Sequence, residues 1–176
     1  MSSRKNVYKL VLAGMFLALA LVLPLLTGQI PQIGKMLSPM HIPVLLCGFF
    51  CGPWYGLVVG FIAPLLRGLI FGMPVLFPSG VIMAVEIATY GSVSGLLYKH
   101  LPNKIVYIYV TLIAAMLAGR VVWGVVSAIV YGITKAEFGW QAFMAGAFIN
   151  AIPGIILHIV LIPVIVIALR KYTAKD

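Results

Sequence analysis

Long runs of apolar residues, interrupted by isolated charges, dominate the chain. Uncharged runs cover residues 10–34, 36–66, 68–85, 105–119 and 138–169. A helix needs about 20 mostly apolar residues to cross the hydrocarbon core of a membrane. The runs are continuous and lack the alternation of a membrane β-barrel, so the pattern predicts membrane-spanning helices.

Merging the runs that one internal charge separates gives six predicted spans. They cover residues 8–27, 40–51, 55–71, 79–98, 105–132 and 141–169. The second span is short, and Cys51-Gly52-Pro53 predicts a turn before the third. We found no internal repeat and no appended soluble domain. We therefore expect an all-α membrane protein with six transmembrane helices in one bundle, and residues 1–176 as a single domain.

Composition and charge distribution support this prediction and orient the bundle. The chain is 63% hydrophobic and 9% charged, whereas soluble domains contain about 25% charged residues. Most basic residues in the connections and at the ends of the spans fall on one side, namely Arg4, Lys5, Lys9, Lys99, Lys104, Arg170, Lys171 and Lys175. Positively charged loops stay in the cytoplasm, so we expect both termini there. The net charge of +9 then reflects contact with anionic lipid, and no nucleic-acid partner is expected.

Four polar residues fall deep within the spans: Arg67, Glu86, Arg120 and Asn150. With a rise of about 1.5 Å per helical residue, all four lie in the outer half or near the midplane. A charge at the centre of a membrane helix costs about 2.5 to 3.5 kcal/mol, so each charge needs a partner, a pocket or a route to water.

Helical spacing adds companions to these residues. One stripe joins Arg120 to Trp123 and Ser127, another joins Glu86 to Tyr90, and a third joins Asn150 to Gly154 and His158. Two arginines and one carboxylate leave an excess positive charge beside aromatic rings, which predicts a pocket for a small anion. Alternatives remain. Arg120 and Glu86 could form a mutual ion pair, Arg67 could snorkel to the surface, and His158 could be a packing residue.

The stretch PMHIPVLLCGFFCGPWYGLVVGFIAPLLRGLIFGMP, residues 39–74, resembles the substrate-binding (S) component of energy-coupling factor (ECF) vitamin transporters. The resemblance extends over essentially the whole chain and is greatest to the branch with pantothenate and vitamin B6-type members. It implies a protein of a bacterial cell membrane that captures a small vitamin near the outer face, beneath the first and third outer loops.

The resemblance and the polar residues together define the expected site. The expected substrate-binding residues are Arg120, Glu86, Asn150, Trp123, Ser127, Tyr90, Arg67 and His41. Pantothenate is the first expectation. A neutral vitamin (pyridoxine, a pyrimidine precursor or riboflavin) is the alternative if Arg120 and Glu86 neutralise each other. Cys47 and Cys51 have no further ligand nearby, so neither a metal nor another cofactor is expected.

The resemblance also implies partners, namely a transmembrane coupling (T) subunit and two ATPase subunits. The chain has no GxxxxGK[ST] phosphate-binding loop of its own. Gly14 and Ala18 form a small-xxx-small face similar to the Ala-xxx-Ala motif with which related S components dock on the coupling subunit. Intramolecular packing is the alternative role of this face.

Two other function classes receive less support. An intramembrane enzyme would need a catalytic constellation such as Ser/His/Asp or His-Glu-x-x-His, and we found none, so no enzymatic activity is expected. A stand-alone facilitator would need a polar path through the inner half of the bundle, where His158 is the only polar side chain expected.

Overall fold

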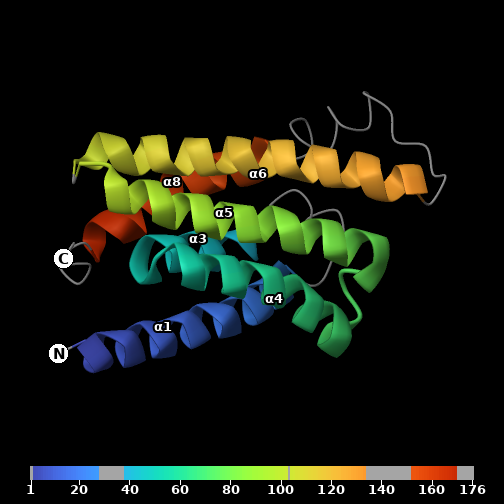
Figure 1. The fold of residues 1–176 in the computed structure, drawn as a ribbon, viewed down its shortest axis with the longest axis horizontal. Helices are drawn as coiled ribbons and strands as arrows, with labels where there is room; N and C mark the ends of the chain where they lie inside the picture. The colour runs from blue at the N-terminus through green and yellow to red at the C-terminus, as the bar shows by residue number, and fades with distance from the viewer. Residues whose placement is uncertain (1, 28–37, 103, 134–151, 170–176) are drawn as a thin grey trace.

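The computed structural model describes residues 2–27, 38–102, 104–133 and 152–169. These ranges form six α-helices and two short helical turns (Figure 1). In chain order they are α1 (Ser2–Val22), η1 (Leu23–Thr27), α3 (His41–Cys51), α4 (Pro53–Phe71), η2 (Leu76–Gly80), α5 (Val81–His100), α6 (Ile105–Ile133) and α8 (Ile152–Ala168). The predicted all-α bundle is confirmed.

Helix lengths agree with a multi-pass membrane protein. Four helical segments of the described chain are long and apolar enough to cross a membrane: Arg4–Leu26, Pro53–Phe71, Leu76–His100 and Ile105–Ile133. The helices α3 and α8 are apolar but shorter. The first five predicted spans match helices of the structure. Of the sixth, α8 covers residues 152–168, and residues 141–151 lie outside the described residues.

The shortness of α3 follows from the turn predicted at residues 51–53. Gly52 has φ of 101°, in the region that only glycine adopts readily, and it separates α3 from α4. Pro53 then begins α4 at the position where its missing N–H costs nothing. The chain therefore reverses within the bundle after 11 residues of α3.

The helices α3 and α5 lie at the centre of the bundle. Helix α3 packs against α1, α4, α5 and α8, and α5 packs against α3, α4 and α6. Helix α1 lies at one side of the bundle and α6 and α8 at the other (Figure 1). The start of α1 and the end of α8 lie at the same end of the bundle (Figure 1). We refer to the opposite end, where α4 and α6 end, as the outer end, following the prediction from charge.

Glycines allow α3, α4 and α5 to approach each other backbone to backbone. A Cβ atom added at Gly56 or at Gly91 would overlap the backbone of the other residue. A Cβ atom at Gly48 would overlap the backbone of Gly91 and the side chain of Ser94. Small residues of this kind bring membrane helices close enough for extensive van der Waals contact. We call this contact the glycine-lined interface.

Candidate functional site

Polar side chains from three helices meet in the interior of the bundle. Glu86 and Tyr90 lie one turn apart on α5, Arg120 lies on α6, and His41 is the first residue of α3. Glu86 is only 3% exposed. The structure therefore brings together four of the residues that the sequence predicted for a single site.

The Glu86 carboxylate is the common partner of this cluster. Its Oε1 atom lies 3.0 Å from Nη1 of Arg120 and accepts a hydrogen bond of 3.0 Å from the Tyr90 hydroxyl. Nε2 of His41 lies 3.8 Å from the same oxygen, too far for a hydrogen bond. Glu86 and Arg120 thus form the mutual ion pair that the sequence left as an alternative.

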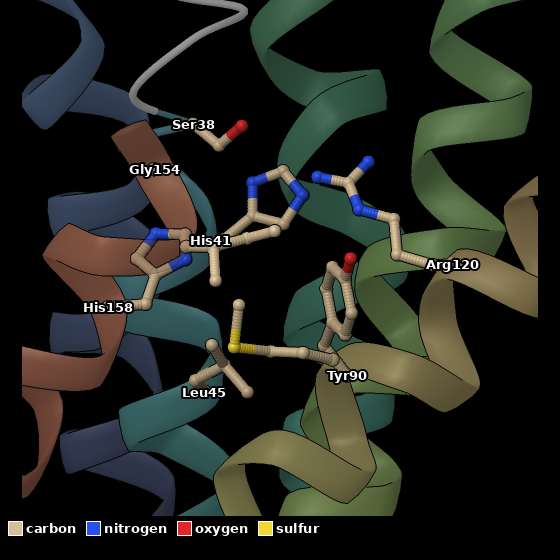
Figure 2. A pocket seen from close by; sticks show the side chains of 9 residues that line it. Ser38, His41, Leu45, Tyr90, Arg120, Gly154 and His158 are labelled. Carbon is tan, nitrogen blue, oxygen red and sulfur yellow. The ribbon is translucent and has the colours of Figure 1, made fainter. Parts of the chain in front are cut away.

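A cavity adjoins the ion pair, between the first turns of α3 and α8 (Figure 2). The enclosed space is small, about 10 Å³, and an empty volume of about 240 Å³ is reached only when the part open to solvent is included. It is lined by Ser38, His41, Leu45, Tyr90, Met116, Arg120, Gly154, Ile155 and His158. Glu86 is not among these residues, so the carboxylate holds Arg120 and Tyr90 from behind the cavity wall.

Two histidines give the cavity its unused hydrogen-bonding capacity. The rings of His41 and His158 stack with their centroids 6.0 Å apart, and the His41 ring also contacts Tyr90 at 5.1 Å. Nδ1 and Nε2 of His41 and Nε2 of His158 are buried and have no hydrogen-bond partner among the described residues. Buried polar atoms are nearly always paired, so these nitrogens are suited to meet a bound molecule.

Arg67 lies elsewhere in the bundle. Its side chain is 4% exposed, and Nη1 donates a hydrogen bond of 2.9 Å to the carbonyl of Leu21. Leu21 is in the last turn of α1, where helix carbonyls lack an intrahelical donor. The guanidinium also lies 5.2 Å from the centre of the Phe71 ring. Arg67 therefore joins α4 to the end of α1, and it neither lines the cavity nor snorkels.

Three other residues predicted for the site are not placed in it by the structure. Trp123 is half-buried on α6 and does not line the cavity. Ser127 is buried seven residues beyond Arg120 on the same helix, which corresponds to about 10 Å along the axis. Asn150 lies outside the described residues.

Sequence reasoning missed some of the lining residues. His158 was not among the expected substrate-binding residues, although it shares a helical stripe with Gly154, and both line the cavity. The shared stripe was the signal by which the sequence could have placed His158 in the site. Leu45, Met116 and Ile155 carry no polar signal that would distinguish them from core residues.

The small-residue face of α1 points away from the bundle. Gly14 and Ala18 are both exposed, and a Cβ atom at Gly14 would meet nothing within 4 Å. The opposite face buries Ala13, Phe16 and Ala20 against the core. Packing within the described part of the chain therefore does not explain the two small residues.

Cys47 and Cys51 are buried free thiols on α3. Among the described residues, no group of three or more His, Cys, Asp or Glu side chains is placed to hold a metal ion.

The apolar helices place the protein in the class of multi-pass membrane proteins, and the polar cavity is its candidate binding site. Residues 8–166 match the model of the family described as ECF transporter, substrate-specific component, and the chain belongs to that family. No curated protein and no solved structure matches the chain. The family is a component of transporters and not a family of enzymes. Membership implies a small-molecule substrate and, in general, coupling and ATPase partners.

Proposed function

We propose that this protein captures a small water-soluble vitamin in the cavity between α3, α5, α6 and α8, for import by an ATPase-driven coupling module. The observation that supports this most is the pair of buried imidazoles with unpaired nitrogens on the cavity wall. A substrate-specific component must bind its substrate without help from ATP. A pocket with a few precisely placed polar groups is the usual form of such a site.

The proposed setting is the membrane of a bacterial cell, with both termini in the cytoplasm. The distribution of Lys and Arg supports this orientation. It places the cavity toward the outer face, because α3 and α8 would both begin there. Substrate would enter from outside and leave toward the coupling subunit.

The choice of vitamin depends on the Glu86–Arg120 pair. Pantothenate was predicted on the assumption that an arginine is free to neutralise an anion. The 3.0 Å ion pair meets the condition set for the alternative, a neutral vitamin such as pyridoxine, a pyrimidine precursor or riboflavin. The neutral alternative is therefore better supported.

Isothermal titration calorimetry on purified protein tests this function. The panel comprises pantothenate, the B6 vitamers, thiamine precursors and riboflavin. We expect one member to bind in a 1:1 ratio without ATP. If folded protein gives no response to the whole panel, the proposal is wrong.

We further propose that the exposed face at Gly14 and Ala18 docks on the transmembrane coupling subunit, which is joined by two ATPase subunits. Helix α1 packs on α3 and α4, whereas the cavity is lined from α3, α5, α6 and α8. A change on the outer face of α1 can therefore affect docking and leave the cavity intact. Small residues permit the close approach that docking of a membrane helix requires.

Replacing Gly14 and Ala18 together with Trp tests the docking face. Affinity for the vitamin in detergent should match that of the parent protein, and uptake should fail in cells that supply the coupling subunit and ATPases. The matched control is Met15→Trp and Leu19→Trp, because these exposed residues have the same spacing and lie about 100° further around α1. Normal uptake by the Gly14/Ala18 variant would rule out docking at this face.

A further inference from the structure

Among the residues that the structure describes, the charges around the cavity balance. Arg120 is the only Lys or Arg side chain on the cavity wall among the described residues, and Glu86 lies against it. With both imidazoles in their neutral forms, the site has no net charge. An anion bound there would leave one negative charge uncompensated in a largely buried site, where charge is costly.

Glu86 also restricts what Arg120 can do. The carboxylate is buried and is bonded to both Arg120 and Tyr90. A ligand carboxylate could draw Arg120 away only by leaving Glu86 as a buried unpaired charge, which is strongly unfavourable. Glu86 therefore fixes the guanidinium and offsets its charge, and the remaining N–H groups of Arg120 are left to act as hydrogen-bond donors.

The remaining wall contains neutral polar groups and apolar surface. Neutral imidazole has one donor and one acceptor nitrogen, so His41 and His158 together can donate hydrogen bonds to a ligand and accept them from it. Leu45, Met116 and Ile155 add apolar contacts. The cavity thus combines hydrogen-bonding nitrogens on one part of its wall with apolar surface on another.

We propose that the substrate carries no net charge, that His41 and His158 hydrogen-bond to it, and that Glu86 is the residue that excludes anions. This inference rests on the proposed function and specifies the substrate class of the same site. Glu86 acts as a positioning residue, because it works through Arg120 and Tyr90 and does not line the cavity.

The experiment compares matched probes that differ in one charged group. The pairs are pantothenol with pantothenate, pyridoxine with pyridoxate, riboflavin with riboflavin phosphate, and hydroxymethylpyrimidine with its phosphate. Calorimetry at neutral pH measures both affinities for each pair that binds. We expect the uncharged member to bind at least about tenfold more tightly, since uncompensated charge in a buried site is costly.

Charge variants assign the selectivity to Glu86. Glu86→Gln keeps an acceptor for Tyr90 and leaves Arg120 uncompensated, so the preference should shift toward the anion by about tenfold or more. The double variant Glu86→Gln with Arg120→Gln removes both charges and should restore the preference for the uncharged probe. If the single variant fails to fold, the double variant is measured in its place. Arg67→Gln is the matched control, because Arg67 is buried outside the cavity. In this variant the ratio of the two probe affinities should equal that of the parent.

The outcomes separate this inference from the proposed function. If no probe binds to folded protein, the proposed function fails and the inference fails with it. If the anionic member of a pair binds more tightly to the parent protein, the function stands and the inference is wrong. The role of Glu86 is overturned if Glu86→Gln leaves the ratio of the two probe affinities unchanged, or if the double variant prefers the anion.

Discussion

The glycine-lined interface and the cavity are built in opposite ways, although α3 and α5 contribute to both. At Gly48, Gly56 and Gly91 the helix backbones meet with no space for a single added carbon. At the cavity, buried nitrogens of His41 and His158 lack partners. The first region gains stability from close packing, whereas the second gives up stability by keeping polar atoms unpaired.

The two regions depend on each other. The glycine-lined interface fixes α3 against α5, and these helices hold His41, Glu86 and Tyr90 at one height. Preorganised groups bind with less loss of conformational freedom. Mutations in the interface should therefore act mainly on stability, and mutations in the cavity mainly on binding.

Gly91→Ala should have the largest effect on stability. The new methyl group would overlap the backbone of Gly56, which cannot move without shifting α4. We expect a loss of about 3 kcal/mol or more, the upper range for overpacking, measured by thermal unfolding in detergent. Gly14→Ala is the control and should leave the midpoint unchanged or raise it slightly, because nothing lies within 4 Å of its Cβ position and alanine is the better helix former. Equal midpoints for the two variants would contradict close packing at Gly91.

Arg67→Gln should have the next largest effect. The change removes the donor to the Leu21 carbonyl and the contact with Phe71. We expect a loss of about 1 to 3 kcal/mol in unfolding free energy and unchanged ligand affinity. Weaker binding at unchanged stability would show that Arg67 belongs to the site after all.

His158→Phe should separate binding from stability. Phenylalanine keeps a ring of similar size and removes the unpaired Nε2 atom, but it also removes the hydrogen bond between the ring and the Ser38 backbone, so stability should stay within about 1 kcal/mol of the parent. Affinity for the bound vitamin should fall by about tenfold, as expected when a ligand hydrogen bond is lost in a buried site. His100→Phe is the control, because His100 is exposed at the end of α5. Unchanged affinity in His158→Phe would remove this histidine from the site.

Gly119→Ala should give the smallest effect on affinity. Its methyl group would overlap the ring of Tyr90, which is buried and bonded to Glu86, so the ring must shift. We expect a severalfold loss of affinity and a loss of about 1 to 3 kcal/mol in stability, as for overpacking. Gly132→Ala, on the same helix with nothing within 4 Å of its Cβ position, should bind as the parent does. Identical affinities for the two variants would show that the position of Tyr90 does not matter.

The sequence predicted the helices well because continuous apolar runs and the Gly52-Pro53 turn are local signals. It also predicted Glu86, Arg120 and Tyr90 as a group, because intramembrane charges need partners and helical spacing defines their neighbours. The failures concern long-range packing. Arg67 bonds to a carbonyl 46 residues away, a pairing that no local pattern reveals.

The glycine-lined interface was equally hidden from the sequence. Glycines are frequent in membrane helices, and no spacing rule identified Gly56 and Gly91 as neighbours. The sequence also left a packing role open for His158, as a residue that hydrogen-bonds between helices. Only the approach of α8 to α3 places its ring beside His41.

Native mass spectrometry tests the central claim most directly, namely that the cavity between α3, α5, α6 and α8 binds a vitamin. Protein purified from cells grown with the vitamin panel should carry one small water-soluble molecule per chain. Met116→Trp, which fills the cavity from α6, should be folded and carry none. A bound molecule retained in the filled variant, or none on the folded parent protein together with no response to the panel, would contradict the claim.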